Sequence, residues 1–155
     1  MKYSILVAFL LLFVFSACNS NDDDCDTQAQ QDFLIENRDQ PGVTETDSGL
    51  QYKVLDEGTE ELSHSADDRV EVHYSGRTID GEVFDSSYDR GETAEFSLNG
   101  VIPGFSEGIQ LMNVGDTYEL YIPGNLAYGN RPPPNSIICP NGTLIFEVEL
   151  IQIVE

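Results

Sequence analysis

The sequence predicts an α+β domain, in which a curved antiparallel β-sheet wraps around one short α-helix. Three observations support this fold class. Several short segments alternate apolar and polar residues, as half-buried strands do. One segment has the apolar spacing of a helix, and turns rich in Gly and Pro separate the elements. Several strands with a single helix favour a sheet that carries the helix on one face.

The first 17 residues predict a targeting segment rather than part of this fold. Lys2 precedes an apolar run over residues 5–15, which is shorter than the ~20 residues of a membrane-spanning helix. A positive start, a short apolar core and small residues at the exit are typical of a secretory signal. Ser16-Ala17-Cys18 resembles the lipobox of bacterial lipoproteins, with Phe15 where Leu is usual. We therefore expect residues 1–17 to be a lipoprotein signal peptide and Cys18 to carry lipid, so that the membrane is reached through the lipid anchor alone.

Residues 18–42 are predicted to form an acidic tether followed by a short linker or helix. With Cys18 lipidated, Cys25 and Cys139 remain as an even pair. In an oxidising compartment they either form a disulfide or stay as two free thiols.

The formal charge of −21 argues against nucleic-acid binding, which depends on cationic contacts to phosphate. The charge favours a solvated surface or attraction of basic client segments. The spacing of Cys and His resembles no zinc site, and we expect neither a metal nor a cofactor.

The strands of the domain are predicted from period-two patterns. In the first strand Leu50, Tyr52 and Val54 alternate with polar residues, and the second places Tyr74 on its apolar face. Asp80-Gly81 is a hairpin-type turn signal. The predicted strands cover residues 50–54, 70–75, 83–85, 95–98, 118–122 and 144–150.

The helix is predicted over residues 103–112. Pro103 suits a first-turn position, and Phe105, Ile109 and Met112 share one face at i, i+4 and i+7. The connection that follows the next strand, residues 123–140, is long, and long loops inside a compact domain are often functional.

A series of motifs in order resembles the FKBP-type peptidyl-prolyl cis-trans isomerases, over roughly residues 43–155. The lead-in, residues 48–54, is similar to the secreted bacterial branch that includes the macrophage infectivity potentiator proteins. The motifs are Val72-His73-Tyr74-Ser75-Gly76, Gly81-x-x-Phe84-Asp85-Ser86-Ser87, Val101-Ile102-Pro103-Gly104-Phe105, Gly108-x-x-x-Met112-x-x-Gly115, Ala127-Tyr128-Gly129 and Thr143-Leu144-Ile145-Phe146-Glu147-Val148-Glu149-Leu150.

The resemblance implies a site for proline between sheet and helix. Its catalytic residues would be Tyr128, Asp85, Ile102 and Phe84, and its other substrate-binding residues Tyr74, Val101, Phe105, Ile137 and Phe146. The Ile102 N–H and the Tyr128 hydroxyl would bond carbonyls flanking the prolyl bond, and Phe105 would form the floor where Trp is common. Asp85 has a second interpretation, as a cap of the turn at Ser86-Ser87, and Phe96 is assigned to the core.

The function implied is isomerisation of X-Pro bonds in exported polypeptides within the bacterial cell envelope, on the periplasmic face of the outer membrane or the cell surface. Tacrolimus and rapamycin are plausible ligands by the same resemblance. A client-binding chaperone that uses the pocket with little turnover is the alternative, and a structural lipoprotein is a third. The extension before the domain is shorter than the helical extensions of relatives that dimerise, so a monomer is expected.

Overall fold

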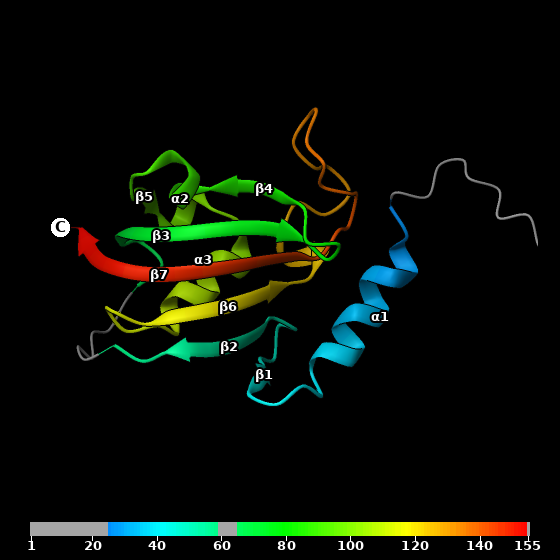
Figure 1. Ribbon diagram of the computed structural model, residues 1–155, viewed down its shortest axis with the longest axis horizontal. Helices are drawn as coiled ribbons and strands as arrows, with labels where there is room; N and C mark the ends of the chain where they lie inside the picture. The colour runs from blue at the N-terminus through cyan, green and yellow to red at the C-terminus, as the bar shows by residue number, and fades with distance from the viewer. Residues whose placement is uncertain (1–24, 59–64, 155) are drawn as a thin grey trace, which may run out of the picture.

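The computed structural model of the chain describes residues 25–58 and 65–154. The predicted signal peptide and Cys18 lie outside these residues. Seven antiparallel strands form one sheet in the order β1-β2-β6-β7-β3-β4, with β5 paired to β3 (Figure 1). The elements are α1 Thr27–Asn37, β1 Val43–Glu45, β2 Gln51–Asp56, β3 Arg69–Thr78, β4 Val83–Ser86, α2 Ser87–Arg90, β5 Ala94–Ser97, α3 Pro103–Gln110, β6 Thr117–Ile122 and β7 Leu144–Val154, with 3-10 turns at Leu98–Gly100 and Gly124–Leu126.

The antiparallel sheet and the packed helix confirm the predicted fold class. Each strand predicted from the sequence is present, although β1 and α2 were not predicted because they are too short to show a period. The long strands β3 and β7 pair along their length, and their register shifts between Glu71 and Val72. Such a bulge bends and twists a strand, which suits a sheet that curves around a helix.

Helix α3 lies behind the sheet in Figure 1 and supplies the predicted apolar face. Phe105 and Ile109 are buried in the main core. Two glycines allow the helix to approach β6 closely: a Cβ at Gly104 would lie 2.4 Å from Ile122, and one at Gly108 would lie 2.5 Å from Leu120. Real Cβ contacts are essentially never this short. Helix α3 and the Phe105 ring can therefore pack this close to the sheet only with glycine at both positions.

Helix α1 packs against the ends of the strands rather than extending freely from the domain (Figure 1). The buried Asn37 amide donates to Gln51 Oε1 at 2.9 Å, and Gln51 donates to the Leu34 carbonyl at 2.9 Å. Phe33 packs near Tyr121 of β6, with ring centroids 6.1 Å apart. The segment expected as a short linker or helix is therefore a docked helix with a buried polar contact.

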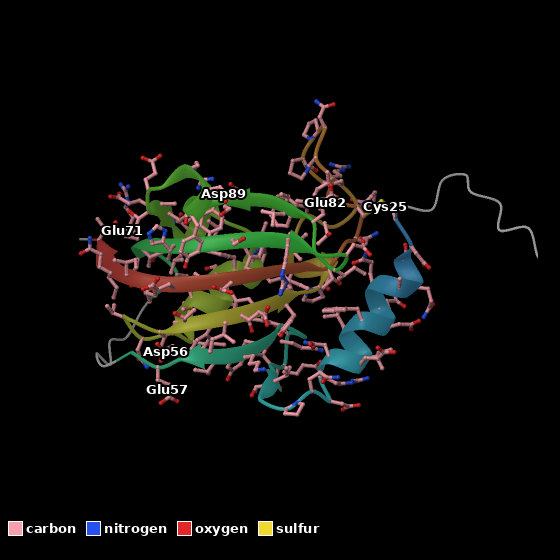
Figure 2. The ribbon with its side chains drawn as sticks, viewed as in Figure 1. Cys25, Asp56, Glu57, Glu71, Glu82 and Asp89 are labelled. Atoms are coloured by element: carbon pink, nitrogen blue, oxygen red, sulfur yellow. A yellow bond between two sulfur atoms is a disulfide. The ribbon has the colours of Figure 1, made fainter. Side chains whose placement is uncertain are left out.

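The cysteine pair left open by the sequence is bridged. Cys25, just before α1, forms a disulfide with Cys139, and the two Cα atoms lie 5.3 Å apart. Figure 2 shows Cys25 beside the loop that connects β6 to β7. Within residues 25–58 and 65–154, no helix combines the length and the apolar character needed to cross a membrane.

Candidate functional site: an aromatic pocket between sheet and helix

A cavity of about 470 Å³ opens between α3, the β3–β4 hairpin and the loop after β6. Its residues come from segments far apart in the sequence, which the sheet brings together. The lining residues are Tyr74, Phe84, Asp85, Phe96, Gly100, Val101, Ile102, Phe105, Tyr128, Pro133, Ser136, Ile138 and Phe146.

Aromatic rings form the floor and walls of the cavity through edge contacts. The Phe105 ring lies 5.3 Å from Phe146 and 6.3 Å from Tyr74, and Phe84 lies 5.4 Å from Phe146, all centroid to centroid. These three pairs are T-shaped, the arrangement that aromatic quadrupoles favour. Because each ring contacts another, the apolar surface keeps its shape without a ligand.

Gly76 of β3 makes room for this arrangement. A Cβ at this position would lie 2.6 Å from the Phe84 ring and 2.7 Å from Phe146. The motif that ends in Gly76 is thus explained by packing, because any larger side chain would push two walls of the pocket.

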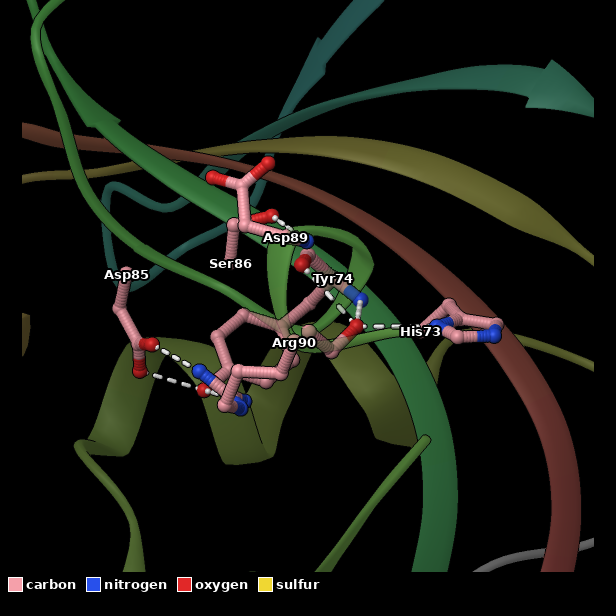
Figure 3. A network of polar contacts seen from close by, with 7 residues as sticks. His73, Tyr74, Asp85, Ser86, Asp89 and Arg90 are labelled. Atoms are coloured by element: carbon pink, nitrogen blue, oxygen red, sulfur yellow. Dashed lines mark hydrogen bonds and ion pairs between the residues drawn. The ribbon is translucent and has the colours of Figure 1, made fainter. Parts of the chain in front are cut away.

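One polar corner interrupts the apolar lining (Figure 3). The Tyr74 hydroxyl donates to one oxygen of Asp85, and Arg90 of α2 donates to the other. Arg90 also donates to the Tyr74 hydroxyl at 3.1 Å, with its guanidinium 5.6 Å from the centre of the Tyr74 ring. Burial raises the pKa of Tyr74, and the hydrogen bond to Asp85 raises it further. The phenol therefore stays protonated near neutral pH.

The backbone of Tyr74 is held from behind by the buried Ser87. The Ser87 hydroxyl accepts the Tyr74 N–H at 2.8 Å and lies 3.0 Å from Nδ1 of His73 (Figure 3). The His73 ring stacks on Tyr88, with ring centroids 4.6 Å apart. The Ser86 hydroxyl accepts from the Asp89 N–H as the cap of α2. The interpretation of Asp85 as the cap is therefore wrong, since Ser86 fills that position and leaves Asp85 to face Tyr74 and Arg90.

Ile102 and Tyr128 stand at the mouth of the cavity. The Ile102 carbonyl accepts from Phe105 and Ser106 at the start of α3. Its N–H has no hydrogen-bond partner among the described residues. Tyr128 is 39% exposed. Both residues line the cavity, and their bonding to a chain that lies across the opening stays a prediction from the resemblance.

Ile137 does not line the cavity, which corrects one predicted site residue. Its side chain is 42% exposed, whereas the adjacent Ile138 is 7% exposed and lies in the lining. Neighbouring side chains of a non-helical chain point in different directions, and an Ile-Ile pair carries no signal for which one faces inward. Phe96, assigned to the core, also lines the cavity and lies 5.9 Å from Phe105.

The lining defines what the cavity can do chemically. It offers apolar surface, one carboxylate and a few hydroxyls, and contains neither Cys nor His. Among the described residues no group of three or more His, Cys, Asp or Glu could hold a metal ion. Such a site suits shape-selective binding of a peptide, with chemistry that makes and breaks no covalent bond.

A sheet wrapped around one helix, with a ring-walled cavity between them, defines a domain whose site suits a peptide without covalent chemistry. The chain belongs to the FKBP-type peptidyl-prolyl cis-trans isomerase family, and the match to this family covers residues 60–151. Residues 18–54 match the domain that stands amino terminal to FKBP-type isomerases.

Two relatives and two solved structures show the extent of this similarity. The FKBP-type 22 kDa isomerase of Escherichia coli K12 is 54% identical over 78% of this chain and 58% of its own length. The outer membrane protein MIP of Legionella longbeachae is 46% identical, over 78% and 51%. The chain thus spans roughly half the length of the curated relatives it matches.

Among solved structures, an isomerase from Pseudomonas syringae superposes with a TM-score of 0.76 at 35% identity, covering 83% of this chain and 92% of that one. FkpA from Escherichia coli also gives 0.76, at 40% identity, covering 81% and 58%.

Proposed function

We propose that this chain is a peptidyl-prolyl cis-trans isomerase that assists the folding of exported proteins in the bacterial cell envelope. The observation that carries the proposal is the cavity formed by Tyr74, Phe84, Phe105 and Phe146. Ile102 also lines it, and the Ile102 N–H has no hydrogen-bond partner among the described residues. Family membership and relatives named as isomerases support it.

The proposed mechanism lowers the barrier to rotation by removing water. Rotation about a peptide bond costs ~18–20 kcal/mol because amide resonance is lost in the twisted state. The planar amide places charge on oxygen and nitrogen, so water stabilises it more than the twisted form. A dry aromatic cavity withdraws that solvation, and a shape that fits the twisted proline binds the transition state in preference to the ground state. Each ~1.36 kcal/mol removed from the barrier gives a tenfold higher rate.

Each site residue has a role in this proposal. Phe105 is the floor beneath the proline ring, and Phe84, Tyr74, Phe146 and Val101 are its walls. The Ile102 N–H and the Tyr128 hydroxyl hold carbonyl groups on either side of the prolyl bond. Asp85 accepts hydrogen bonds from polar groups of the bound chain, and Tyr74 and Arg90 fix its position.

We further propose a monomer that reaches the membrane through lipid on Cys18 after removal of residues 1–17. A relative named as an outer membrane protein supports an envelope location. The packing of α1 against its own sheet supports a monomer. The partners proposed are proline-containing polypeptides, with tacrolimus or rapamycin as competing ligands.

The test is cis-trans exchange of short Leu-Pro and Phe-Pro peptides, followed by NMR with the full chain in detergent. Acceleration that rapamycin abolishes, and that Phe84→Ala removes, is expected. A folded protein that binds the drug without accelerating exchange would instead be a client-binding module. Absence of both binding and acceleration would contradict the assignment of the pocket.

A further inference from the structure

The segment before the domain is bonded to the end of the loop that borders the pocket. We call residues 131–140 the proline-rich loop. Cys25 is bonded to Cys139 near the end of this loop. Just beyond it, the Thr143 N–H donates to Gln30 Oε1 at 2.8 Å, and both side chains are buried. The chain around the start of α1 is thus attached at two successive points, Cys139 and Thr143, to the stretch that leads from the proline-rich loop into β7.

The same loop supplies one wall of the cavity. Pro133, Ser136 and Ile138 line it, and Ile138 directly precedes the bridged Cys139. The aromatic rings of the lining come from other segments: Tyr74 from β3, Phe105 from α3 and Phe146 from β7.

The tip of the proline-rich loop has few other attachments. Most of its residues are exposed. Among the described residues its backbone hydrogen bonds are short-range: the Ser136 N–H donates to the Pro133 carbonyl at 3.2 Å, and the Arg131 N–H donates to the Tyr128 carbonyl at 3.1 Å. Beyond Cys139, the Asn141 N–H donates to the Gly129 carbonyl at 2.6 Å. In the described part of the chain, the Cys25 bridge is therefore the covalent constraint that lies next to the lining residue Ile138.

We propose that Cys25 is a positioning residue of the pocket. By fixing Cys139 it fixes Ile138 and the proline-rich loop against the cavity, so that affinity for the chain flanking proline depends on the N-terminal segment. This inference rests on the proposed function of the pocket, and it assigns to the segment before the domain a part in substrate binding rather than in tethering alone.

The physical reason is preorganisation of a flexible wall. A loop that is already ordered loses less conformational freedom when a ligand binds, and the saving for one immobilised side chain corresponds to roughly three- to tenfold in affinity. The rings that would act on the twisted bond stand on the sheet and α3 and are held by contacts with one another. The bridge should therefore change KM and leave kcat nearly as it is.

The test compares the full chain with the Cys25→Ser/Cys139→Ser double variant. NMR exchange spectroscopy on a Leu-Pro peptide over a range of concentrations separates KM from kcat. We expect KM to rise roughly three- to tenfold, in line with the lost preorganisation, while kcat stays within about twofold. Amide hydrogen exchange of residues 135–138 should become faster in the variant. A folded variant with unchanged KM and unchanged loop exchange would overturn the proposal.

Dithiothreitol on the unmutated chain gives a second measurement that does not depend on folding of the variant. The reductant supplies two electrons and two protons, the S–S bond breaks into two thiols, and dithiothreitol closes to its own disulfide. Under conditions where circular dichroism shows a retained fold, the same rise in KM is expected. The double variant should not respond, and an equal response would overturn the proposal.

Asn37→Ala is the matched control. Asn37 lies at the other end of α1 and bonds Gln51, so the substitution weakens docking of the helix without touching the proline-rich loop. Its KM should equal that of the unmutated chain. A rise as large as in the double variant would mean that the bridge affects KM only through the general stability of the protein. If the unmutated chain itself shows no isomerisation, the proposed function fails, and the loop exchange rates still decide whether Cys25 orders the wall.

Discussion

The hydroxyl of Tyr74 on β3 donates to the carboxylate of Asp85 on the adjacent strand β4, inside a pocket that is otherwise walled by rings. Arg90 joins them from α2 by donating to both. A short hairpin followed by one helical turn therefore places three polar side chains at one corner. The arrangement fixes the edge of the Tyr74 ring and holds one carboxylate in the lining of the cavity.

Tyr74→Phe should keep the wall and lose the polar corner. We expect the free energy of unfolding to fall by about 1 kcal/mol, the usual net value of one hydrogen bond. We expect kcat/KM to fall by roughly fivefold, if a similar energy is lost from the bound state. Urea denaturation and NMR exchange check the two quantities. Asp89→Asn, on the exposed side of α2, is the control, and a Tyr74→Phe variant equal to it in both would refute the role of the corner.

Gly76→Ala should damage the pocket more than the fold around it. The new Cβ would meet the Phe84 and Phe146 rings at 2.6 and 2.7 Å, so both walls must move. Overpacking of this kind typically costs 1–3 kcal/mol, and we expect kcat/KM to fall by about tenfold or more. Ser75→Ala is the control, because the adjacent side chain of the strand points to the opposite face. Equal activities of the two variants would show that the rings have more room than their contacts indicate.

The free energy of unfolding should fall at alkaline pH, because two buried tyrosines must then lose their protons. Burial raises the pKa of Tyr118 to about 12, and burial together with a hydrogen bond to Glu119 raises that of Tyr121. The fold favours the neutral phenol, so this stability is fully present below the unfolded pKa near ~10. It is lost as pH rises from there through about 12.

Urea denaturation at a series of alkaline pH values checks this prediction. The decline in stability with pH should be shallower in Tyr118→Phe, which also loses its bond to the Leu111 carbonyl and so begins from lower stability. An unchanged slope would mean that Tyr118 does not carry the effect. Activity should stay nearly flat around neutral pH, because Tyr74 remains protonated.

Periodicity predicted the sheet and α3 well, because burial on one face leaves a regular signal. Phe105 and Ile109 fall at helical spacing and are buried as expected. Gln51 shows where this reasoning stops. It alternates with Leu50 and Tyr52 as a polar residue of the outer face, yet it is 1% exposed because α1 covers it. A segment with no clear apolar stripe gave no warning that it would dock there.

The candidate site was predictable where ordered motifs fix residue positions on strands and α3. The wall formed by the proline-rich loop was not, since an irregular loop has no period. Ile137 and Ile138 could be distinguished only by the path of the chain, which the Cys25–Cys139 bridge helps to set. Arg90 likewise enters the polar corner through the single turn of α2, which is too short to be read from the sequence.

The disulfide should contribute a large share of the stability of the fold. It joins residues separated by 114 positions, and closing a long loop restricts the unfolded chain more than closing a short one. We expect the Cys25→Ser/Cys139→Ser variant to lose about 2–4 kcal/mol, the typical value for a disulfide, with a somewhat higher bound for so long a loop. The restriction also makes the unfolded state more compact, so the denaturant m-value should rise when the bridge is removed. Urea denaturation with and without dithiothreitol measures both, with the double variant as the sample that should not respond. A loss below about 1 kcal/mol, under the lower end of the usual range, would mean that Gln30, Asn37 and Phe33 already dock α1 without the bridge.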